Sequence, residues 1–317
     1  MLFRSFPREV SQLGLTLTER GLVPDRLIRH GIRILIRQRL RELEVAQKTS
    51  ATRLEKDFIQ RMSDATIAPV PDKANEQHYE VPAQFFQSIL GPHLKYSSGF
   101  WPIGTKTLAD AESAALRETC THARLEDGQS ILELGCGWGS LTLWIAARYP
   151  KSCITAVSNS HSQREYIEAQ AQQRGFRNLT VATSDMNCFD IEPEGFDRIV
   201  SVEMFEHMRN WPALFARVHR WLKPSGLFFM HIFTHRAVPY LFEDLGPGDW
   251  MSRYFFTGGM MPSVRLPLAC QDHLKCLHRW RWNGTHYEKT ANAWLENMDA
   301  AYATLWPVFE QIGRAHV

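Results

Sequence analysis

The sequence predicts an α/β fold in which helices cover both faces of a doubly wound, mostly parallel sheet. Three observations predict this fold class. Short apolar segments alternate with amphipathic helical segments from about residue 125 to residue 233. A glycine-rich turn follows the first apolar segment directly. The chain has 317 residues, 44% of them hydrophobic, which is enough to bury a large core.

The expected elements follow one another at the spacing of βαβ units. We expect five strands, over 130–135, 153–158, 179–185, 196–205 and 226–233. Helices are expected over 140–149, 162–175 and 213–223, the second ended by a glycine and the third by Pro-Ser-Gly. The first 70 residues are predicted to be helical, and residues 68–75, with two prolines and no periodicity, are interpreted as a linker.

The segment 26–47 carries apolar residues near one helical face, with six arginines interspersed among them. The apolar residues are Leu27, Ile28, Ile32, Leu35, Ile36, Leu40 and Leu43. We expect this helix to pack on its own protein with a solvated arginine face. The alternative is a basic amphipathic helix that lies on an anionic membrane surface.

Composition and charge exclude several classes of protein. A net charge of +2 gives no reason to expect a nucleic-acid partner. No apolar run approaches the roughly 18 residues of a membrane span, and the N-terminus is too polar for a secretory signal. The six cysteines form no CxxC pair, which favours free thiols in a reducing compartment over disulfides or a metal site. We therefore expect a cytoplasmic protein without a metal.

The turn after the first strand is the strongest chemical signal in the sequence. It has the form E-x-G-x-G-x-G, from Glu133 through Gly135 and Gly137. Glycines let the backbone approach a ligand closely, and the following helix offers unpaired N–H groups. The spacing fits neither a P-loop nor a dinucleotide fingerprint. An acid here would repel a pyrophosphate, but it suits the ammonium and sulfonium groups of S-adenosylmethionine.

Polar residues at the ends of the next two strands complete a predicted cofactor site. Asp185 is placed to accept a hydrogen bond from an adenine amino group. The second strand ends in Ser158 and Asn159 rather than in a ribose-binding acid. The amide of Gln163, at the start of the next helix, is positioned to bond the ribose hydroxyls.

Several longer motifs carry a resemblance to a known family. They are GLVPDRLIR (21–29), HYEVPAQFF (78–86), KYSSGFW (95–101), LELGCGWGS (132–140), VSNSHSQREYI (157–167), VEMFEHM (202–208) and RYFFTGGMMPS (253–263). Together they resemble the cyclopropane-fatty-acyl-phospholipid synthase superfamily, and most of all its coclaurine N-methyltransferase-like branch. The resemblance spans about residues 18 to 310.

The resemblance implies a seven-stranded, Rossmann-like class I methyltransferase fold that binds S-adenosylmethionine, with an N-terminal helical cap over the cofactor. It implies a helical region over 1–75, a cap segment over 76–124 and a methyltransferase domain over 125–311. The implied cofactor contacts are Tyr79, Tyr96, Ser97, Gly135, Gly137, Gln163, Asp185 and Met186. Glu133, Ser158 and Asn159, identified above from the turns themselves, complete the predicted set. The implied catalytic residues are Glu203, Glu206 and His207, on the substrate side of the cofactor.

One position separates the chemistries of the superfamily. Lipid cyclopropanases have a cysteine that helps to hold a bicarbonate, and Ser98 stands at that place here. The other bicarbonate residues have counterparts in Glu206, His231 and Tyr287. The loss of the cysteine argues against cyclopropanation of lipid acyl chains. Such a lipid enzyme, with bicarbonate and peripheral membrane contact, stays the alternative.

Direct methyl transfer to a small amine is the simpler interpretation. The methyl carbon of a sulfonium is already electrophilic, so the enzyme mainly aligns donor and acceptor and excludes water. An amine attacks only when it is neutral, so a nearby base should take its proton. Glu206 and His207 are the candidates, and Glu203 would share a helical face with His207. A non-catalytic cofactor-binding protein is a third hypothesis, which these three residues disfavour.

The end of the sequence departs from the family pattern. The last six residues, 312–317, resemble a translated sequencing adapter and are interpreted as a non-native tail. The family continues with a further helix and a final strand that inserts into the sheet. We therefore expect the C-terminal strand to be missing and the chain as given to be poorly soluble.

Overall fold

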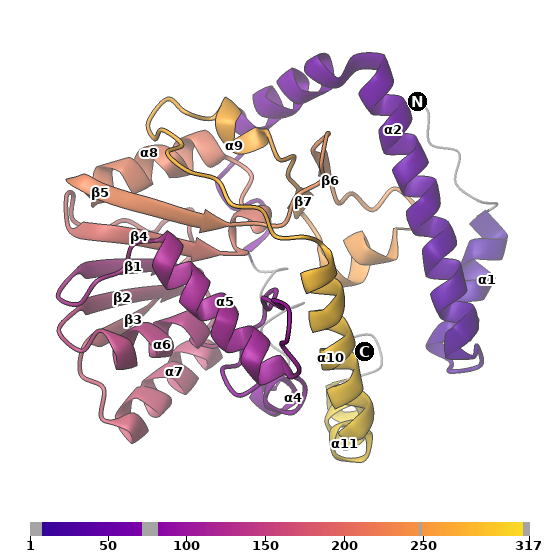
Figure 1. Ribbon diagram of the computed structural model, residues 1–317. Helices are drawn as coiled ribbons and strands as arrows, with labels where there is room; N and C mark the ends of the chain where they lie inside the picture. The colour runs from indigo at the N-terminus through magenta and orange to yellow at the C-terminus, as the bar shows by residue number, and fades with distance from the viewer. Residues whose placement is uncertain (1–7, 72–81, 247–248, 313–317) are drawn as a thin grey trace.

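A computed structural model describes residues 8–71, 82–246 and 249–312 (Figure 1). Its helices are α1 (Arg8–Glu19), α2 (Asp25–Ser63), α4 (Ala83–Ile89), α5 (Leu108–His122), α6 (Ser140–Arg148), α7 (His161–Arg174), α8 (Trp211–Trp221), α9 (Leu266–Ala269), α10 (Thr285–Ala300) and α11 (Tyr302–Ile312), with the short turns η1 (Phe205–His207) and η2 (Met251–Phe255). Its strands are β1 (Ser130–Leu134), β2 (Cys153–Ser158), β3 (Leu179–Thr183), β4 (Phe196–Val202), β5 (Leu222–His231), β6 (Tyr240–Leu241) and β7 (Met260–Met261). No helix among these residues is long and apolar enough to cross a membrane.

The main sheet has five strands in the order β3-β2-β1-β4-β5, and every neighbouring pair is parallel. This arrangement confirms the predicted fold class. All five expected strands are present, although β5 begins at Leu222 rather than at residue 226. The resemblance implies seven strands, whereas the described residues contribute five to this sheet. The separate β6 and β7 form a small antiparallel pair.

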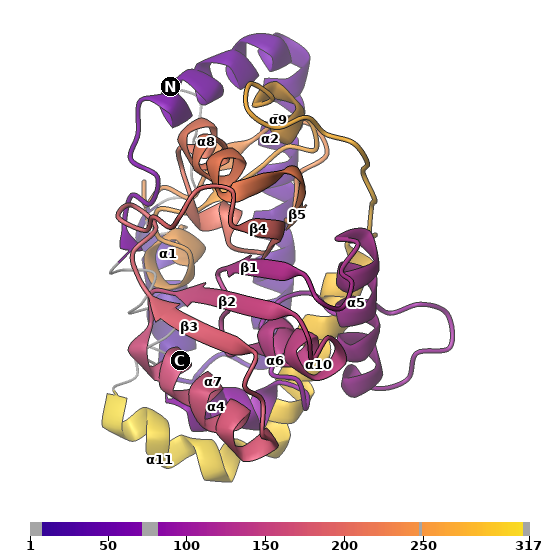
Figure 2. The same ribbon diagram turned by 90° about the vertical axis from the view of Figure 1, so that its left-hand side faces the viewer.

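The two faces of the sheet are covered by different helices (Figure 2). On one face, α5 and α6 bury Leu116 and Ile145 against β1 and β2, and α7 buries Ile167 against β2 and β3. On the other face, α8 and the end of α2 pack over Leu132 and Leu134 of β1. Alternate residues of β1 therefore face opposite layers, as expected for a strand inside a parallel sheet.

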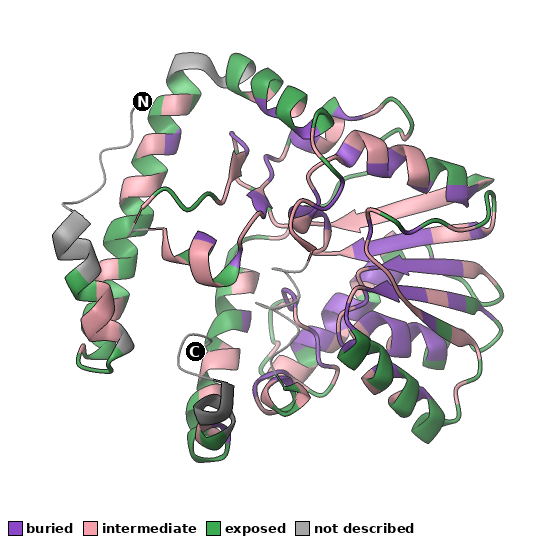
Figure 3. Cartoon of the chain, turned by 180° about the vertical axis from the view of Figure 1, so that it is seen from behind, coloured by how far each residue is buried: buried purple, intermediate pink, exposed green. Residues whose placement is uncertain are grey.

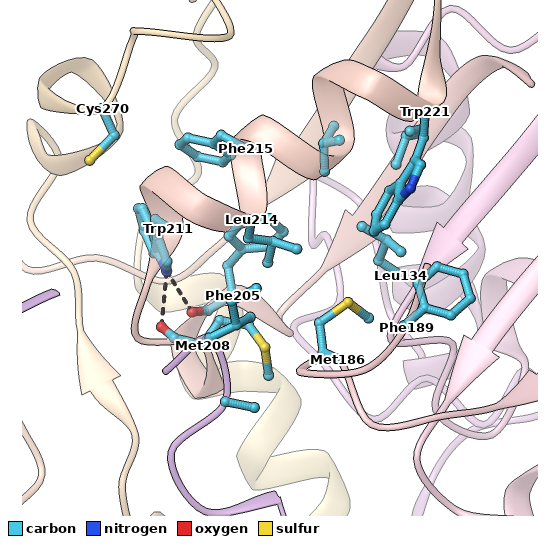
Figure 4. Close-up of a cluster of buried hydrophobic side chains, with 14 of the residues drawn as sticks. Leu134, Met186, Phe189, Phe205, Met208, Trp211, Leu214, Phe215, Trp221 and Cys270 are labelled. Atoms are coloured by element: carbon cyan, nitrogen blue, oxygen red, sulfur yellow. Dashed lines mark hydrogen bonds between the residues drawn. The ribbon is translucent and has the colours of Figure 1, made fainter. Parts of the chain in front are cut away.

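The core around α8 consists of large aromatic and sulfur-containing side chains (Figure 4). Trp211 and Phe215 of α8 pack against Phe205, which immediately precedes two predicted catalytic residues. The Trp211 indole Nε1 donates to the backbone oxygens of Phe205 (2.9 Å) and Met208 (3.1 Å). The turn that carries Glu206 and His207 is thereby fixed at both ends to a buried ring.

Residues 67 and 68, at the start of the expected linker, are hydrogen-bonded to the loops after β3 and β4. The amide of Ala68 donates to Asn187 Oδ1 (2.9 Å), and Asn187 Nδ2 donates to the Ala68 oxygen (2.8 Å). The amide of Arg209 donates to the oxygen of Ile67. The described part of the linker, 68–71, is therefore a wall against the carboxyl edge of the sheet, and residues 72–75 lie outside the described residues.

Helix α2 begins at Asp25, one residue before the expected segment, and continues to Ser63, so it has 39 residues. Its last part packs on α8, where Phe58 and Met62 are buried. Figure 3 shows that exposed and half-buried residues predominate along the rest of the helix. Its first part is largely exposed: Leu27 is 61% exposed and Ile36 is 53% exposed, whereas Leu43 is buried. The expectation that the whole apolar face of 26–47 packs on its own protein is therefore wrong for most of that face.

Candidate functional site

A pocket lies at the carboxyl edge of the sheet, where the loops after β1, β2, β3 and β4 meet. Ligands of open α/β sheets bind at this edge, where the strand order reverses. The pocket is lined by Ala68, Val70, Pro71, Gly135, Gly137, Val157, Ser158, Asn159, Gln163, Ser184, Asp185, Met186, Met204, His207, Met208 and Thr257. Eight of the residues predicted from the sequence are therefore brought together here.

The turn after β1 adopts the backbone conformation that its glycines predict. Gly135 and Gly137 have φ angles of +81° and +52°, in the left-handed region that side chains disfavour. A Cβ at Gly135 would lie 2.5 Å from Met204 Cγ, so the turn also passes close to the loop after β4. At Gly137 no atom lies within 4 Å of that position, so the backbone there borders open space.

Glu133 lies beneath this turn and does not line the pocket. Its Oε2 accepts a hydrogen bond from Thr142 Oγ1 (2.5 Å) on α6, and only 3% of the residue is exposed. Burial raises the pKa of the Glu133 carboxyl to about 8, even though the hydrogen bond from Thr142 opposes the shift. In this structure Glu133 therefore joins the turn to α6, and its predicted cofactor contact stays a prediction.

The end of β2 holds a serine and an amide in one orientation. Ser158 Oγ donates to Gln163 Oε1 at 2.6 Å, and the Ser160 side chain caps α7 by accepting from the Gln163 amide. The Gln163 side chain is buried, and its Nε2 has no hydrogen-bond partner among the described residues. Buried amide donors are nearly always paired, so this one is consistent with a ligand oxygen in the pocket. Asn159 Nδ2 instead donates to the Pro71 oxygen (3.4 Å).

The end of β3 is closed by an Asp–Asn pair. Asp185 Oδ1 accepts from the Asn187 amide (2.9 Å), and Asp185 Oδ2 accepts from Asn187 Nδ2 (3.2 Å). Because Asn187 also bonds Ala68, the two loops form one continuous wall. Met186 is buried beside Asp185 and supplies an apolar surface. The predicted adenine contact by Asp185 and Met186 stays a prediction.

Glu203, directly after β4, is held in a strained conformation. Its φ angle is +52°, which is unusual for a residue other than glycine. Its Oε1 accepts from the Ser98 amide (2.9 Å), and its Oε2 accepts from the Tyr287 hydroxyl (3.2 Å). Burial raises the pKa of Glu203, whereas the positive charge of Lys95 and the two hydrogen bonds oppose that shift. Strain of this kind is characteristic of functional sites.

Glu206 and His231 do not line the pocket. Glu206 is fully buried; its Oε1 accepts from the Phe233 amide (2.7 Å), and its Oε2 has no partner among the described residues. Burial and the nearby Glu203 raise the pKa of Glu206 well above its usual value. Burial and the charge of Lys95 lower the pKa of His231 to about 3, so its imidazole is neutral at physiological pH.

His207 faces the pocket among aromatic side chains. Its ring centroid lies 4.5 Å from that of Phe256, and Phe256 packs against Phe242 (5.0 Å) and Phe233 (5.8 Å). Phe233 in turn approaches Tyr287 (6.5 Å). A titratable imidazole thus stands between the pocket and an apolar aromatic cluster, defined here as Phe233, Phe242, Phe256 and Tyr287.

The predicted cap residues are only partly placed. Tyr79 lies outside the described residues. Tyr96 packs against Phe86 (5.1 Å) and Trp294 (5.7 Å), and Ser97 is buried, where its hydroxyl accepts from the ammonium of Lys95. Neither Tyr96 nor Ser97 lines the pocket. Their cofactor contacts therefore stay predictions.

Three residues near the site were not singled out by the sequence. Asn187 joins the walls of the pocket, and its position two residues after Asp185 is the signature of an Asx turn. Lys95 is a buried lysine directly before the Tyr96–Ser97 motif. Glu112 accepts from the backbone amides of Gly91, His93 and Lys95, which no sequence pattern indicates.

The residues present fit S-adenosylmethionine. The open backbone at Gly137 leaves room for close approach, the unused Gln163 donor suits a ribose oxygen, and Met186 offers an apolar surface for a base. Gly135, Gly137, Ser158, Gln163, Asp185 and Met186 all line this pocket, and their contacts with the cofactor stay predictions.

Comparison with known proteins agrees with this geometry. Residues 70–312 match the family model of mycolic acid cyclopropane synthetase. The chain belongs to this family. It is also 35% identical to (S)-coclaurine N-methyltransferase of Thalictrum flavum subsp. glaucum over 303 residues, which covers 93% of this chain and 82% of that protein. The protein is thus an S-adenosylmethionine-dependent methyltransferase.

Two further relatives mark the range of the family. The cyclopropane-fatty-acyl-phospholipid synthase of Escherichia coli is 32% identical over 234 residues, which covers 73% of this chain and 57% of that enzyme. A crystal structure of coclaurine N-methyltransferase bound to N-methylheliamine and SAH superposes with a TM-score of 0.86 at 32% identity, covering 94% of this chain and 86% of the other. The predicted family membership and cofactor are therefore confirmed.

Proposed function

We propose that the protein N-methylates a small, ring-bearing amine of the alkaloid type, with S-adenosylmethionine as methyl donor. The observation that carries this proposal is the place of His207, between the cofactor pocket and the aromatic cluster. The likeness to coclaurine N-methyltransferase over nearly the whole chain supports it. Aromatic walls suit a flat ring, and they attract a cationic amine through their π-faces.

The chemistry divides between donor and protein. When bound, S-adenosylmethionine supplies an electrophilic methyl group on its sulfonium sulfur. The protein holds the amine nitrogen in line with that group and keeps water out of the aromatic cluster. Gly137, in the turn after β1, and Gln163, after β2, orient the methyl donor. His207, in the turn after β4, orients the amine.

A base is needed because only a neutral amine attacks. His207 faces the pocket and is the residue we propose to take the amine proton. Glu206 lies next to it in the chain, and its raised pKa brings its proton affinity closer to that of an amine. We propose that Glu203 balances the positive charge near the acceptor, since its carboxyl is already fixed by Ser98 and Tyr287.

We propose a cytoplasmic site of action. All six cysteines are unpaired in the structure, although Cys153, Cys188 and Cys276 are exposed. Free, exposed thiols are typical of proteins kept in a reducing compartment.

Modification of lipid acyl chains is the second candidate function. Glu206, His231 and Tyr287, the counterparts of bicarbonate ligands, all surround the β4–β5 end of the sheet. The exposed apolar and arginine-rich part of α2 also suits an anionic bilayer. Against this function, Ser98 stands where the lipid enzymes have cysteine, and its hydroxyl donates to the oxygen of Gly99.

The test is transfer of a labelled methyl group. The protein is incubated with methyl-labelled S-adenosylmethionine and either a panel of benzylisoquinoline and simpler amines or unsaturated phosphatidylglycerol vesicles. We expect label in an amine and none in the lipid. Label in acyl chains alone would overturn the amine proposal and establish the lipid enzyme, with bicarbonate dependence as a further check.

A further inference from the structure

Lys95 has an unusual environment for a lysine. The residue is 3% exposed, and among the described parts of the chain no carboxylate oxygen lies within ion-pair distance of its ammonium. Its Nζ donates instead to Ser97 Oγ and to the backbone oxygen of Ser98 (2.8 Å). Burying an ammonium group is costly, so such a lysine is a poor means of stabilising a fold.

The segment that Lys95 holds also positions Glu203. The Ser98 amide, one peptide away from the bonded oxygen, donates to Glu203 Oε1 at 2.9 Å. The next amide, that of Gly99, donates to Thr290 Oγ1 (3.0 Å) on α10. The peptide that joins Ser98 to Gly99 is therefore fixed at its oxygen by the ammonium of Lys95 and at its N–H by Thr290 of α10. The N–H of the preceding peptide, that of Ser98, is directed at the Glu203 carboxyl group.

We propose that Lys95 is a positioning residue that orients Glu203 through the Ser98 amide and supplies a positive charge near its carboxyl group. The proposal deepens the proposed amine methylation and rests on it for the role of the Glu203 carboxylate. Lys95 does not line the pocket, so we place its action on the substrate at one remove, through the Ser98 amide and Glu203.

The charged and titratable groups around this pair come from every neighbouring element. They are Tyr287 of α10, Glu206 of η1, Glu112 of α5 and His231 of β5. Burial and the nearby Glu203 raise the pKa of Glu206 well above its usual value, and His231 is neutral at physiological pH. Glu112 is already occupied by three backbone amides. Lys95 is thus the nearby cation that the pKa of Glu203 depends on.

The first experiment separates charge from hydrogen bonding in the full-length chain. Lys95→Arg keeps the positive charge, Lys95→Gln keeps a donor without charge, and Lys95→Met keeps neither. For Lys95→Gln and Lys95→Met we expect the acidic limb of the pH profile of kcat/KM to shift to higher pH by at least one pH unit. The activity of both variants should then fall roughly tenfold near neutral pH and recover at high pH. Lys95→Arg should keep the limb in place, and exposed Lys106→Met is the control.

An unmoved limb in Lys95→Gln and Lys95→Met would overturn the proposal, because a purely structural lysine lowers activity equally at all pH values. If Lys95→Met fails to fold, the comparison of Lys95→Gln with Lys95→Arg still shows whether the acidic limb depends on the positive charge. Wild-type protein that methylates no amine would refute the proposed function instead, and the next experiment needs no activity.

The second experiment is a double-mutant cycle on stability at pH 8, with Lys95→Met and Glu203→Gln. In wild type, Glu203→Gln leaves the buried ammonium without its countercharge, so the unfolding midpoint should fall clearly. In the Lys95→Met background no buried ammonium is left without a countercharge, so the same change should lower the unfolding midpoint less. Additive effects of the two substitutions would show that the groups do not interact, and would overturn the proposal.

Discussion

His207 is the residue at which the cofactor pocket and the aromatic cluster meet, since its ring borders the first and contacts Phe256 of the second. We expect His207→Ala to lower kcat by roughly 100- to 10,000-fold, as for loss of a general base. The affinity for S-adenosylhomocysteine, measured by calorimetry, should change little. Exposed His219→Ala is the control. An equal loss of turnover and affinity would place His207 among the cofactor ligands rather than at the acceptor.

Single residues also show where sequence reasoning reaches its limit. Gly135, Gly137, Gln163 and Asp185 could be located because each follows a strand whose end is visible in the sequence. The hydrogen bond from Thr142 of α6 to Glu133 could not be predicted, since it depends on the face of β1 to which the alternation of the strand turns the Glu133 side chain. A motif gives the neighbours along the chain but not the face of the strand that each side chain occupies.

At the scale of elements, the turn between β1 and α6 is the critical joint of the cofactor site. Gly137 combines a φ of +52° with open space on the pocket side, so a valine would be strained and would also project where the ligand lies. We expect Gly137→Val to abolish binding of S-adenosylhomocysteine in calorimetry. Gly128→Val is a matched control, because Gly128 has a φ of +88°, equally open surroundings and no place in the pocket. Equal loss of binding in both variants would trace the effect to misfolding.

The elements themselves were predicted with uneven success. The strands and the helices α6, α7 and α8 were found within a few residues, because apolar runs and cap residues mark them locally. Helix α2 was found, but its packing was not. An amphipathic pattern shows which face is apolar, whereas whether that face is covered depends on tertiary contacts, and Leu27 and Ile36 are exposed here. The segment 68–71 has no periodic pattern, so the sequence predicts a linker there. The hydrogen bonds between Ala68 and Asn187 that fix this segment join distant parts of the chain and leave no local signal in the sequence.

At the scale of the whole molecule, buried carboxyls should make stability depend on pH in an uncommon direction. The folded state holds a proton on Glu133 up to about pH 8, whereas the unfolded chain releases it near its usual pKa of 4.5. Folding therefore binds a proton within this window, and the free energy of unfolding falls as the pH rises through it. The contribution of one group is at most about 1.4 kcal/mol per pH unit.

Glu133→Gln isolates this contribution, since the amide oxygen can still accept from Thr142. Urea denaturation between pH 5 and pH 8 should show wild type losing stability relative to the variant as the pH rises. Glu126→Gln, on an exposed loop, should follow wild type at every pH. Parallel curves for wild type and Glu133→Gln would mean that Glu133 is ionised in the folded protein.

The two hydrogen bonds between Asn187 and Ala68 join positions 119 residues apart. During synthesis Ala68 leaves the ribosome long before Asn187, its hydrogen-bond partner after β3, has been made. The N-terminal helices must therefore wait, unanchored at this point, until three strands of the sheet have been made. This wall of the pocket is therefore complete only after β3 and the residues that follow it have been made.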